Sequence, residues 1–220
     1  MIDAYDVFMS KFGINEEELI KFGVEESKFI DKTKVKNHWE KLKFNIETGN
    51  QTVFIRGYGR DAKGTNMYIE MYKELFGHSN FKKDATNNAV PTKVIKELTG
   101  FSKNVKNDNK YEQIRNYQVS HIFARTKNPF AFSAPWNIVY VPKIVDPFTG
   151  HESKGDLTNK FQKQFQAFFI DYYSDFILEF NNIMTDIFPK LKKYLEKNII
   201  NEQFKNDALK QFEYINKPNM

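Results

Sequence analysis

The chain has 220 residues, with 33 Lys and Arg against 28 Asp and Glu, 22 Phe and no Cys. This length supports one substantial hydrophobic core, and the absence of cysteine excludes a disulfide framework and a thiolate metal site. No apolar run is long enough for a membrane span, and the acidic residues 1–6 lack the apolar region of a secretory signal. We therefore expect a soluble cytoplasmic protein with no membrane partner.

The first 48 residues carry three helical patterns. The spacing of apolar residues predicts helices over residues 5–12, 16–23 and 34–46, and Gly13 and Gly23 mark breaks. We interpret His38, in the third helix, as a packing or surface residue. No chemistry is predicted for this part of the chain.

A short strand is predicted over residues 52–55, followed by a basic loop that contains glycine. Gly59 and Gly64 have the spacing of a nucleotide-binding loop, but Thr65 stands where that loop needs Lys, which argues against an NTPase. Backbone N–H groups of such a loop can still contact a DNA phosphate. The basic side chains expected to assist are Arg56, Arg60 and Lys63.

Helices are predicted over residues 66–76 and 91–99, and the second begins near a proline and ends at Gly100. The segment between them is a candidate recognition element, because lysines bind phosphates and asparagine amides can read adenine edges. Its candidate side chains are Lys82, Lys83, Asn87 and Asn88.

Positive charge is concentrated in the middle of the chain. Residues 50–130 hold 14 Lys and Arg against 7 Asp and Glu. Such an excess favours nucleic-acid binding, since neutralising phosphates dominates that affinity, although a solvated basic face is the plain alternative. Residues 102–110 are polar and without periodicity, so we predict a segment boundary there.

Three polar residues between positions 116 and 154 stand where core packing does not require them. His121 ends an alternating, strand-like run, Asn137 opens a second one, and His151 follows Gly150 at the predicted start of a helix. Hydrolysis of a phosphodiester needs a base for the water proton and a divalent cation on the phosphate. Histidine suits the first role because its ordinary pKa is about 6.5.

Their order resembles the HNH, or ββα-metal, nuclease family over about forty residues. The resemblance implies that His121 is the base, that His151 binds metal, and that Asn137 orients the base or loop or binds metal through its amide oxygen. The matching motifs are Ser120-His121-Ile122, Trp136-Asn137-Ile138 and His151-Glu152-Ser153-Lys154.

The same resemblance assigns further roles. Arg125 and Lys154 would support phosphate charge, and Lys127 and Asn128, in the loop between the strands, would touch DNA near the cut. Many family members carry an acidic ligand directly before the base histidine, where this chain has Ser120. The carboxylates that can supply oxygen ligands to Mg²⁺ or Mn²⁺ are Asp146, Glu152 and Asp156.

Other hypotheses use the same residues. Asp146, Glu152 and Lys154 resemble the carboxylate series of PD-(D/E)XK nucleases, although Pro147 and Gly150 interrupt a strand there. A non-catalytic nucleic-acid-binding protein would use only the basic middle. A helical interaction protein would use the apolar stripe that follows His151.

That stripe predicts a long helical region up to Pro189, and another helix is predicted over residues 201–214. Its apolar face must be buried by the N-terminal helices, by the last helix or by a second subunit.

We predict an α+β fold in which a ββα-metal catalytic unit, residues 111–170, is embedded among α-helices. Residues 1–110 would be a mostly helical DNA-recognition region, and residues 171–220 C-terminal helices for core or dimerisation. The expected protein is a homodimeric restriction endonuclease of double-stranded DNA.

Overall fold

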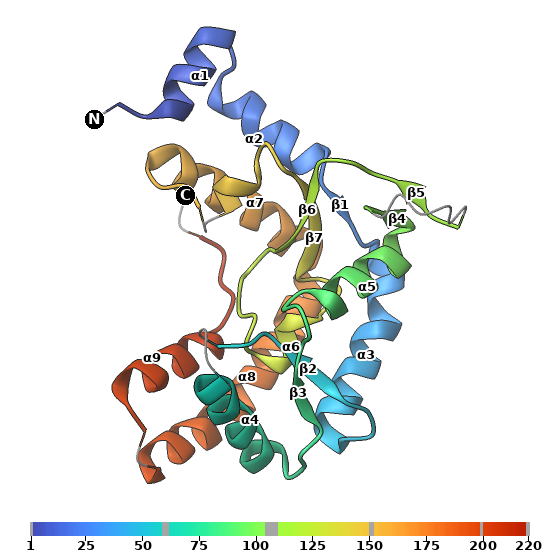
Figure 1. The fold of residues 1–220 in the computed structure, drawn as a ribbon, viewed down its shortest axis with the longest axis vertical. Coiled ribbons are helices and arrows are strands. Elements are labelled where there is room, and N and C mark those ends of the chain that lie inside the picture. Colours follow the sequence, from blue (N-terminus) through green and yellow to red (C-terminus); the bar gives the residue numbers. More distant parts are fainter. Residues whose placement is uncertain (1, 59–61, 104–109, 150–151, 199, 219–220) are drawn as a thin grey trace.

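The computed structural model describes residues 2–58, 62–103, 110–149, 152–198 and 200–218. Helices surround a small antiparallel sheet near the middle of an elongated molecule (Figure 1). The α+β class predicted from the sequence is confirmed. Among the described residues, no helix has the length and apolar character needed to cross a membrane.

The central sheet has three strands in the order β1-β7-β6. Strand β7 (Ile138–Pro142) lies in the middle, between β1 (Lys28–Phe29) and β6 (Tyr117–His121), and both pairs are antiparallel. All five residues of β7 are buried, as expected of a strand covered on both faces. The register places His121 opposite Ile138, so the two predicted strands bring His121 and Asn137 to the same end of the sheet.

The three N-terminal helices are confirmed, with small shifts at their ends. They are α1 (Ala4–Phe12), α2 (Glu16–Glu25) and α3 (Lys32–Thr48). Each begins after a residue whose side chain accepts a backbone N–H, namely Asp3, Asn15 and Asp31.

A second, two-stranded sheet follows, with β2 (Val53–Ile55) parallel to β3 (Phe81–Lys83). Helix α4 (Ala62–Phe76) connects them, and α5 (Ala89–Thr99) comes next. Lys82 and Lys83 lie between the two helices, as predicted, and they belong to strand β3, which the sequence did not predict. Asp84 is fully buried and accepts hydrogen bonds from the first N–H groups of α5, at 2.9 Å from Ala89 and 2.7 Å from Val90.

Strand β4 (Phe101–Ser102) ends at the first residue of the segment predicted as a linker, and β4 pairs in parallel with β5 (Glu112–Gln113). Residues 104–109 lie outside the described residues. A short helix that the sequence did not predict, α6 (Pro129–Phe132), lies between β6 and β7, and a 3₁₀ helix, η1 (Asp146–Thr149), follows β7.

The long helical region is two helices, α7 (Asp156–Tyr172) and α8 (Ser174–Lys197), and α9 (Glu202–Gln211) completes the chain. The prediction that the helix ends at Pro189 is wrong, because α8 continues through this proline. Helix α7 begins later than predicted. Lys154 is exposed and precedes it, so the His-x-x-Lys motif does not place its lysine on the helix.

The apolar stripe is core. Phe161, Phe169 and Phe180 are fully buried, and the cluster that contains them extends from Met9 to Ile215. The chain's own helices bury the stripe. Little of it is therefore exposed for binding another protein, as the hypothesis of a helical interaction protein requires. The cluster draws on residues 1–110, 111–170 and 171–220 alike, and position 170 falls inside α7. The three-segment division remains a prediction.

One pH effect is expected from His38, which is half-buried on α3. Burial lowers the pKa of His38, Lys41 lowers it further, and Glu97 opposes them. The unfolded chain then binds the proton more readily than the folded chain, so the contribution of the neutral ring is present above about pH 6.5 and is lost as the pH falls below it. Urea unfolding of the wild type should show a loss of stability between pH 7 and pH 5 that is smaller in His38→Gln. An equal loss in both proteins would contradict this assignment.

Candidate functional site

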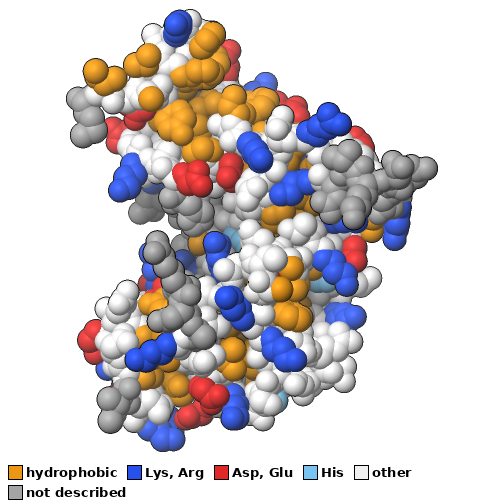
Figure 2. Space-filling view, in the orientation of Figure 1, with side chains coloured by type: hydrophobic (Ala, Val, Ile, Leu, Met, Phe, Trp, Pro, Cys, Tyr) orange, Lys and Arg blue, Asp and Glu red, His pale blue; other side chains and the backbone are white. Residues whose placement is uncertain are grey.

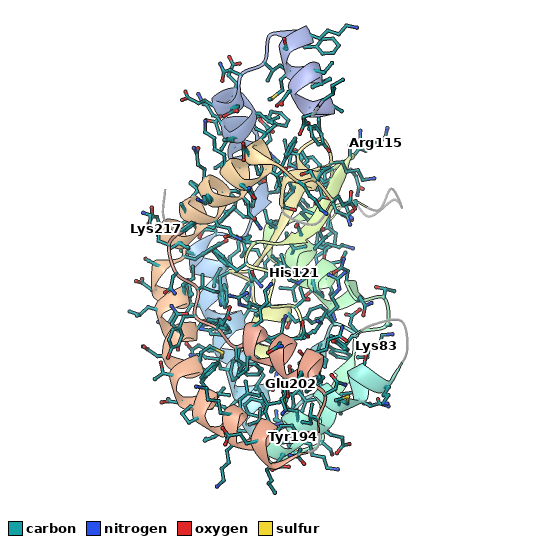
Figure 3. All side chains as sticks on the ribbon, turned by 90° about the vertical axis from the view of Figure 1, so that its left-hand side faces the viewer. Lys83, Arg115, His121, Tyr194, Glu202 and Lys217 are labelled. Atoms are coloured by element: carbon teal, nitrogen blue, oxygen red, sulfur yellow. The ribbon has the colours of Figure 1, made fainter. Side chains whose placement is uncertain are left out.

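A polar cleft of about 450 Å³ opens beside the end of β6. Figure 2 shows the waist of the molecule hollowed on one side, with a histidine visible there, and Figure 3 places His121 near the centre of the molecule. The cleft is lined by segments that are far apart in the sequence. Its polar and charged lining side chains are Arg56, Asn88, Gln118, Ser120, His121, Thr126, Lys127, Asp146, Thr149 and Glu152.

His121 is held in a defined orientation on the wall of the cleft. Its side chain is buried, its Nε2 lies 2.8 Å from the carbonyl oxygen of Phe132, and its ring stacks on the Phe132 ring with centroids 5.6 Å apart. A carbonyl oxygen only accepts hydrogen bonds, so in the neutral ring the proton is on Nε2 and the lone pair is on Nδ1. That tautomer has one basic nitrogen, as a general base needs.

Asn137 is fully buried and organises the loop that follows His121. Its Oδ1 accepts from the N–H of Phe123 at 2.8 Å, while its Nδ2 donates to the carbonyl oxygens of Ala124 at 3.0 Å and Ala131 at 2.9 Å. These bonds fix a tight turn in which Ala124 and Arg125 have φ of 56° and 55°. The expectation that Asn137 binds metal is corrected, because its amide is enclosed by backbone groups. Its other predicted role, orientation of the loop, is the one that its contacts support.

Two carboxylates line the same cleft as its basic residues. Asp146 is half-buried at the start of η1, and Glu152 is exposed in the turn before α7. Within the described part of the chain, which leaves out His151, no three His, Asp or Glu side chains are close enough to hold a metal ion. Magnesium retains several waters and commonly takes one or two protein carboxylates together with substrate phosphates. Asp146 and Glu152 fit this mode of binding, and the ligand role predicted for His151 lies outside the described residues.

Neither carboxylate lies on a strand. Asp146 begins a 3₁₀ helix, and Glu152 and Lys154 lie in the segment that leads to α7. The PD-(D/E)XK arrangement needs its carboxylates on a sheet. The local backbone therefore disfavours that alternative.

A family model described as "Uncharacterised protein PM1201" matches residues 30–217. The chain belongs to the PM1201 family. It is 44% identical over 210 residues to uncharacterized protein PM1201 of Pasteurella multocida (strain Pm70), an alignment that covers 96% of this chain and 92% of that protein. No solved structure matches. All the residues that line the cleft lie within the part that the PM1201 family model covers.

The cleft of this PM1201 family member contains two cations predicted to bind nucleic acid. Arg56 lies just after β2, and its backbone N–H donates to the carbonyl oxygen of Thr126 at 3.2 Å, which joins the two loops. The Lys127 ammonium lies 2.7 Å from the Asp207 carboxylate and 4.3 Å from the centre of the Tyr58 ring. Arg56 therefore supplies positive charge more directly than Lys127, whose charge is partly balanced.

The structure separates the remaining predicted nucleic-acid contacts. Asn88 lines the cleft, and Lys82 and Lys83 are exposed on β3. Asn87 accepts a hydrogen bond from the N–H of Gly57 at 2.8 Å, which orders the loop next to the cleft. Lys63 is exposed on α4, whereas Arg60 lies outside the described residues.

Two predicted contacts need revision. Asn128 is fully buried, where it accepts from the N–H of Phe130 and donates to the carbonyl oxygen of Gln211, so it does not reach DNA. Arg125 points to Glu213 at 3.5 Å, and burial lowers the pKa of its guanidinium. Arg125 is not among the residues that line the cleft.

Sequence reasoning in this PM1201 family member missed several lining residues. Gln118 lies two positions before Ser120 on β6, and strand alternation would have placed it on the same face. Thr149 carries no such signal, since it reaches Ser120, at 3.4 Å between their hydroxyl oxygens, only through the fold of η1. The same holds for Thr126, which is placed by its bond to Arg56.

Proposed function

We propose that this protein is a metal-dependent endonuclease that hydrolyses phosphodiester bonds of double-stranded DNA in the cleft beside β6. The observation that carries the proposal is the meeting of an oriented imidazole, two carboxylates and the Arg56 guanidinium in one cleft. Base, metal ligands and phosphate-binding charge are the groups that this hydrolysis needs.

His121 would act as the general base. Its Nε2–H bond to Phe132 holds the ring in one orientation, and its Nδ1 lone pair would take the proton of the attacking water. Asn137 acts indirectly, by fixing the loop that separates β6 from α6.

The carboxylates would bind the metal ion, and the basic side chains would bind phosphate. Asp146 and Glu152 would hold Mg²⁺ or Mn²⁺, which when bound would neutralise charge on the scissile phosphate and the leaving oxygen. Arg56, supported by Lys127, would contact phosphate oxygens. Lys154 is exposed near Glu152 in the sequence and remains a candidate for the same role.

Within this class we propose a sequence-specific, type II restriction endonuclease. The exposed Lys82 and Lys83 on β3 would contact the backbone of the duplex, and Asn88 would reach it from the start of α5. Cutting both strands at a short symmetric sequence favours a homodimer, since a two-fold protein matches a two-fold site.

The test is to incubate the protein with plasmid and with unmethylated genomic DNA in Mg²⁺, in Mn²⁺ and in EDTA. Discrete fragments that require the metal are expected, and a metal-dependent smear would mean a nonspecific nuclease. DNA that stays intact in every condition, with binding that weakens as salt increases, would replace the proposal with the non-catalytic nucleic-acid-binding protein.

A second arm tests the carboxylates without using activity. Mn²⁺ binding, measured by the loss of its free electron paramagnetic resonance signal, should weaken at least about tenfold in the double variant Asp146→Asn, Glu152→Gln. The matched control is Asp186→Asn, Glu196→Gln on the exposed side of α8, which should bind Mn²⁺ like the wild type. Equal binding by both double variants would remove these carboxylates from the metal site.

A further inference from the structure

A second polar groove lies between α3 and α5 and is separate from the cleft. Its volume is about 360 Å³, within the range of about 300–1,000 Å³ typical of small-molecule sites. Its floor comes from β2, through Val53 and Phe54.

Phe54 supplies the aromatic part of the groove floor. Strand alternation turns Val53 and Ile55 into the core, where both are buried, and directs Phe54 the other way. Phe54 is half-buried and lines the groove. A partly exposed aromatic ring on a strand, next to cations, provides a surface on which a nucleobase can stack.

The polar side chains around Phe54 complement a nucleotide. Lys41 on α3 and Lys93 on α5 are exposed on opposite sides of the groove, and Glu97 is the acidic residue that lines it. Asn45 and Gln51 supply amides that can both donate to and accept from a base edge. Burial, together with Lys41 and against Glu97, lowers the pKa of His38, which favours the neutral imidazole, and a neutral imidazole can also donate and accept.

We propose that the groove between α3 and α5 binds one unpaired nucleotide of a nucleic-acid strand. The base stacks on Phe54, its edge meets Asn45 or Gln51, and the neighbouring phosphates contact Lys41 and Lys93. Stacking needs a free base face, so the preferred ligand is single-stranded or has a base turned out of the duplex.

The groove and the cleft are connected along one strand and one helix. Val53 and Phe54 line the groove, and Arg56, which follows the same strand, lines the cleft. On α5, Val90 borders the groove and the N-cap residue Asn88 borders the cleft. A strand that places a phosphodiester beside His121 can therefore continue over β2 to Phe54. In this respect the inference rests on the proposed function, although binding in the groove does not require catalysis.

The test is fluorescence titration, in EDTA, of a single-stranded DNA hexamer that contains 2-aminopurine, whose emission falls when the base stacks. The wild type should quench it, and Phe54→Leu should weaken the affinity by about fivefold or more and reduce the quenching. In the double variant Lys41→Gln, Lys93→Gln the slope of log affinity against log salt should become shallower by roughly 0.7 for each phosphate that a lysine no longer neutralises.

Matched controls separate these effects from a general loss of folding or charge. Phe44→Leu removes an exposed ring of α3 that does not line the groove, and Lys36→Gln, Lys190→Gln removes two exposed charges that do not line it either. Both controls should bind the hexamer like the wild type. Far-ultraviolet circular dichroism should be unchanged in all four variants.

The outcomes distinguish this proposal from the nuclease proposal. Binding that depends on Phe54 and on the two lysines, in a protein that never cuts DNA, would support the groove and overturn the nuclease. Metal-dependent cutting together with hexamer binding that is unchanged in Phe54→Leu and in the lysine variant would overturn the groove alone. A fully paired hexamer that binds as tightly as the single strand, with the same dependence on Phe54, would also overturn it.

Discussion

Replacing His121 with Gln is expected to abolish metal-dependent DNA cleavage, with a loss of at least about 10²-fold in rate, the lower end of what general base catalysis contributes. Gln can still donate to the carbonyl oxygen of Phe132, but it has no nitrogen lone pair that can take a proton from water. DNA affinity and the urea midpoint should change little, because the buried hydrogen bond has a replacement donor.

The measurement is single-turnover cleavage at saturating protein, with DNA binding measured separately in EDTA. His78→Gln is the matched control, since His78 also pairs its Nε2 with a backbone carbonyl oxygen, that of Ile46 at 2.7 Å, but does not line the cleft. The control should cut at the wild-type rate. A His121→Gln protein that still cuts normally would exclude His121 as the base, and one that fails to fold would assign it a structural role.

Replacing Asn137 with Ala is expected to lower the free energy of unfolding by about 3–5 kcal/mol. The substitution leaves the N–H of Phe123 and the carbonyl oxygens of Ala124 and Ala131 without their buried partner, and each such group costs about 1–3 kcal/mol. The turn with positive φ at Ala124 and Arg125 also loses its support. The rate of DNA cleavage should fall as well, because the loop leads into α6, and the carbonyl oxygen of Phe132 in α6 orients His121.

Equilibrium urea unfolding checks the stability prediction, read from the midpoint at constant slope. The control is Asn181→Ala on α8. Asn181 also makes two hydrogen bonds to a backbone segment, at 2.9 and 3.0 Å to Ile215, but it is only half-buried, so water can replace the missing amide. We expect a loss of about 1 kcal/mol for the control. A loss below about 1 kcal/mol for Asn137→Ala would show that the loop does not depend on this amide.

Much of the local structure follows from signals within a few residues of each element. Asp3, Asn15 and Asp31 cap the first three helices, and Gly13, Gly49 and Gly100 follow helix ends in the left-handed region. Strand β1 was not predicted because two residues carry no periodicity, and its strand conformation depends on pairing with β7, which is distant in the sequence. The prediction of a helix end at Pro189 failed because burial of residues on both sides of it, such as Ile187 and Leu191, outweighs one missing hydrogen bond.

For the candidate site, too, some features follow from local sequence and others only from the tertiary structure. The alternating runs around His121 and Asn137 determined that these two residues share one end of a strand pair, because strand pattern and hairpin connection are local properties. Only the tertiary structure decided that Arg56 and Asn88 reach the same cleft, that Asn128 donates a hydrogen bond to the end of α9, and that Phe54 borders a separate groove. Those positions depend on how one core that extends from Met9 to Ile215 packs its helices, and no short stretch of sequence specifies that packing.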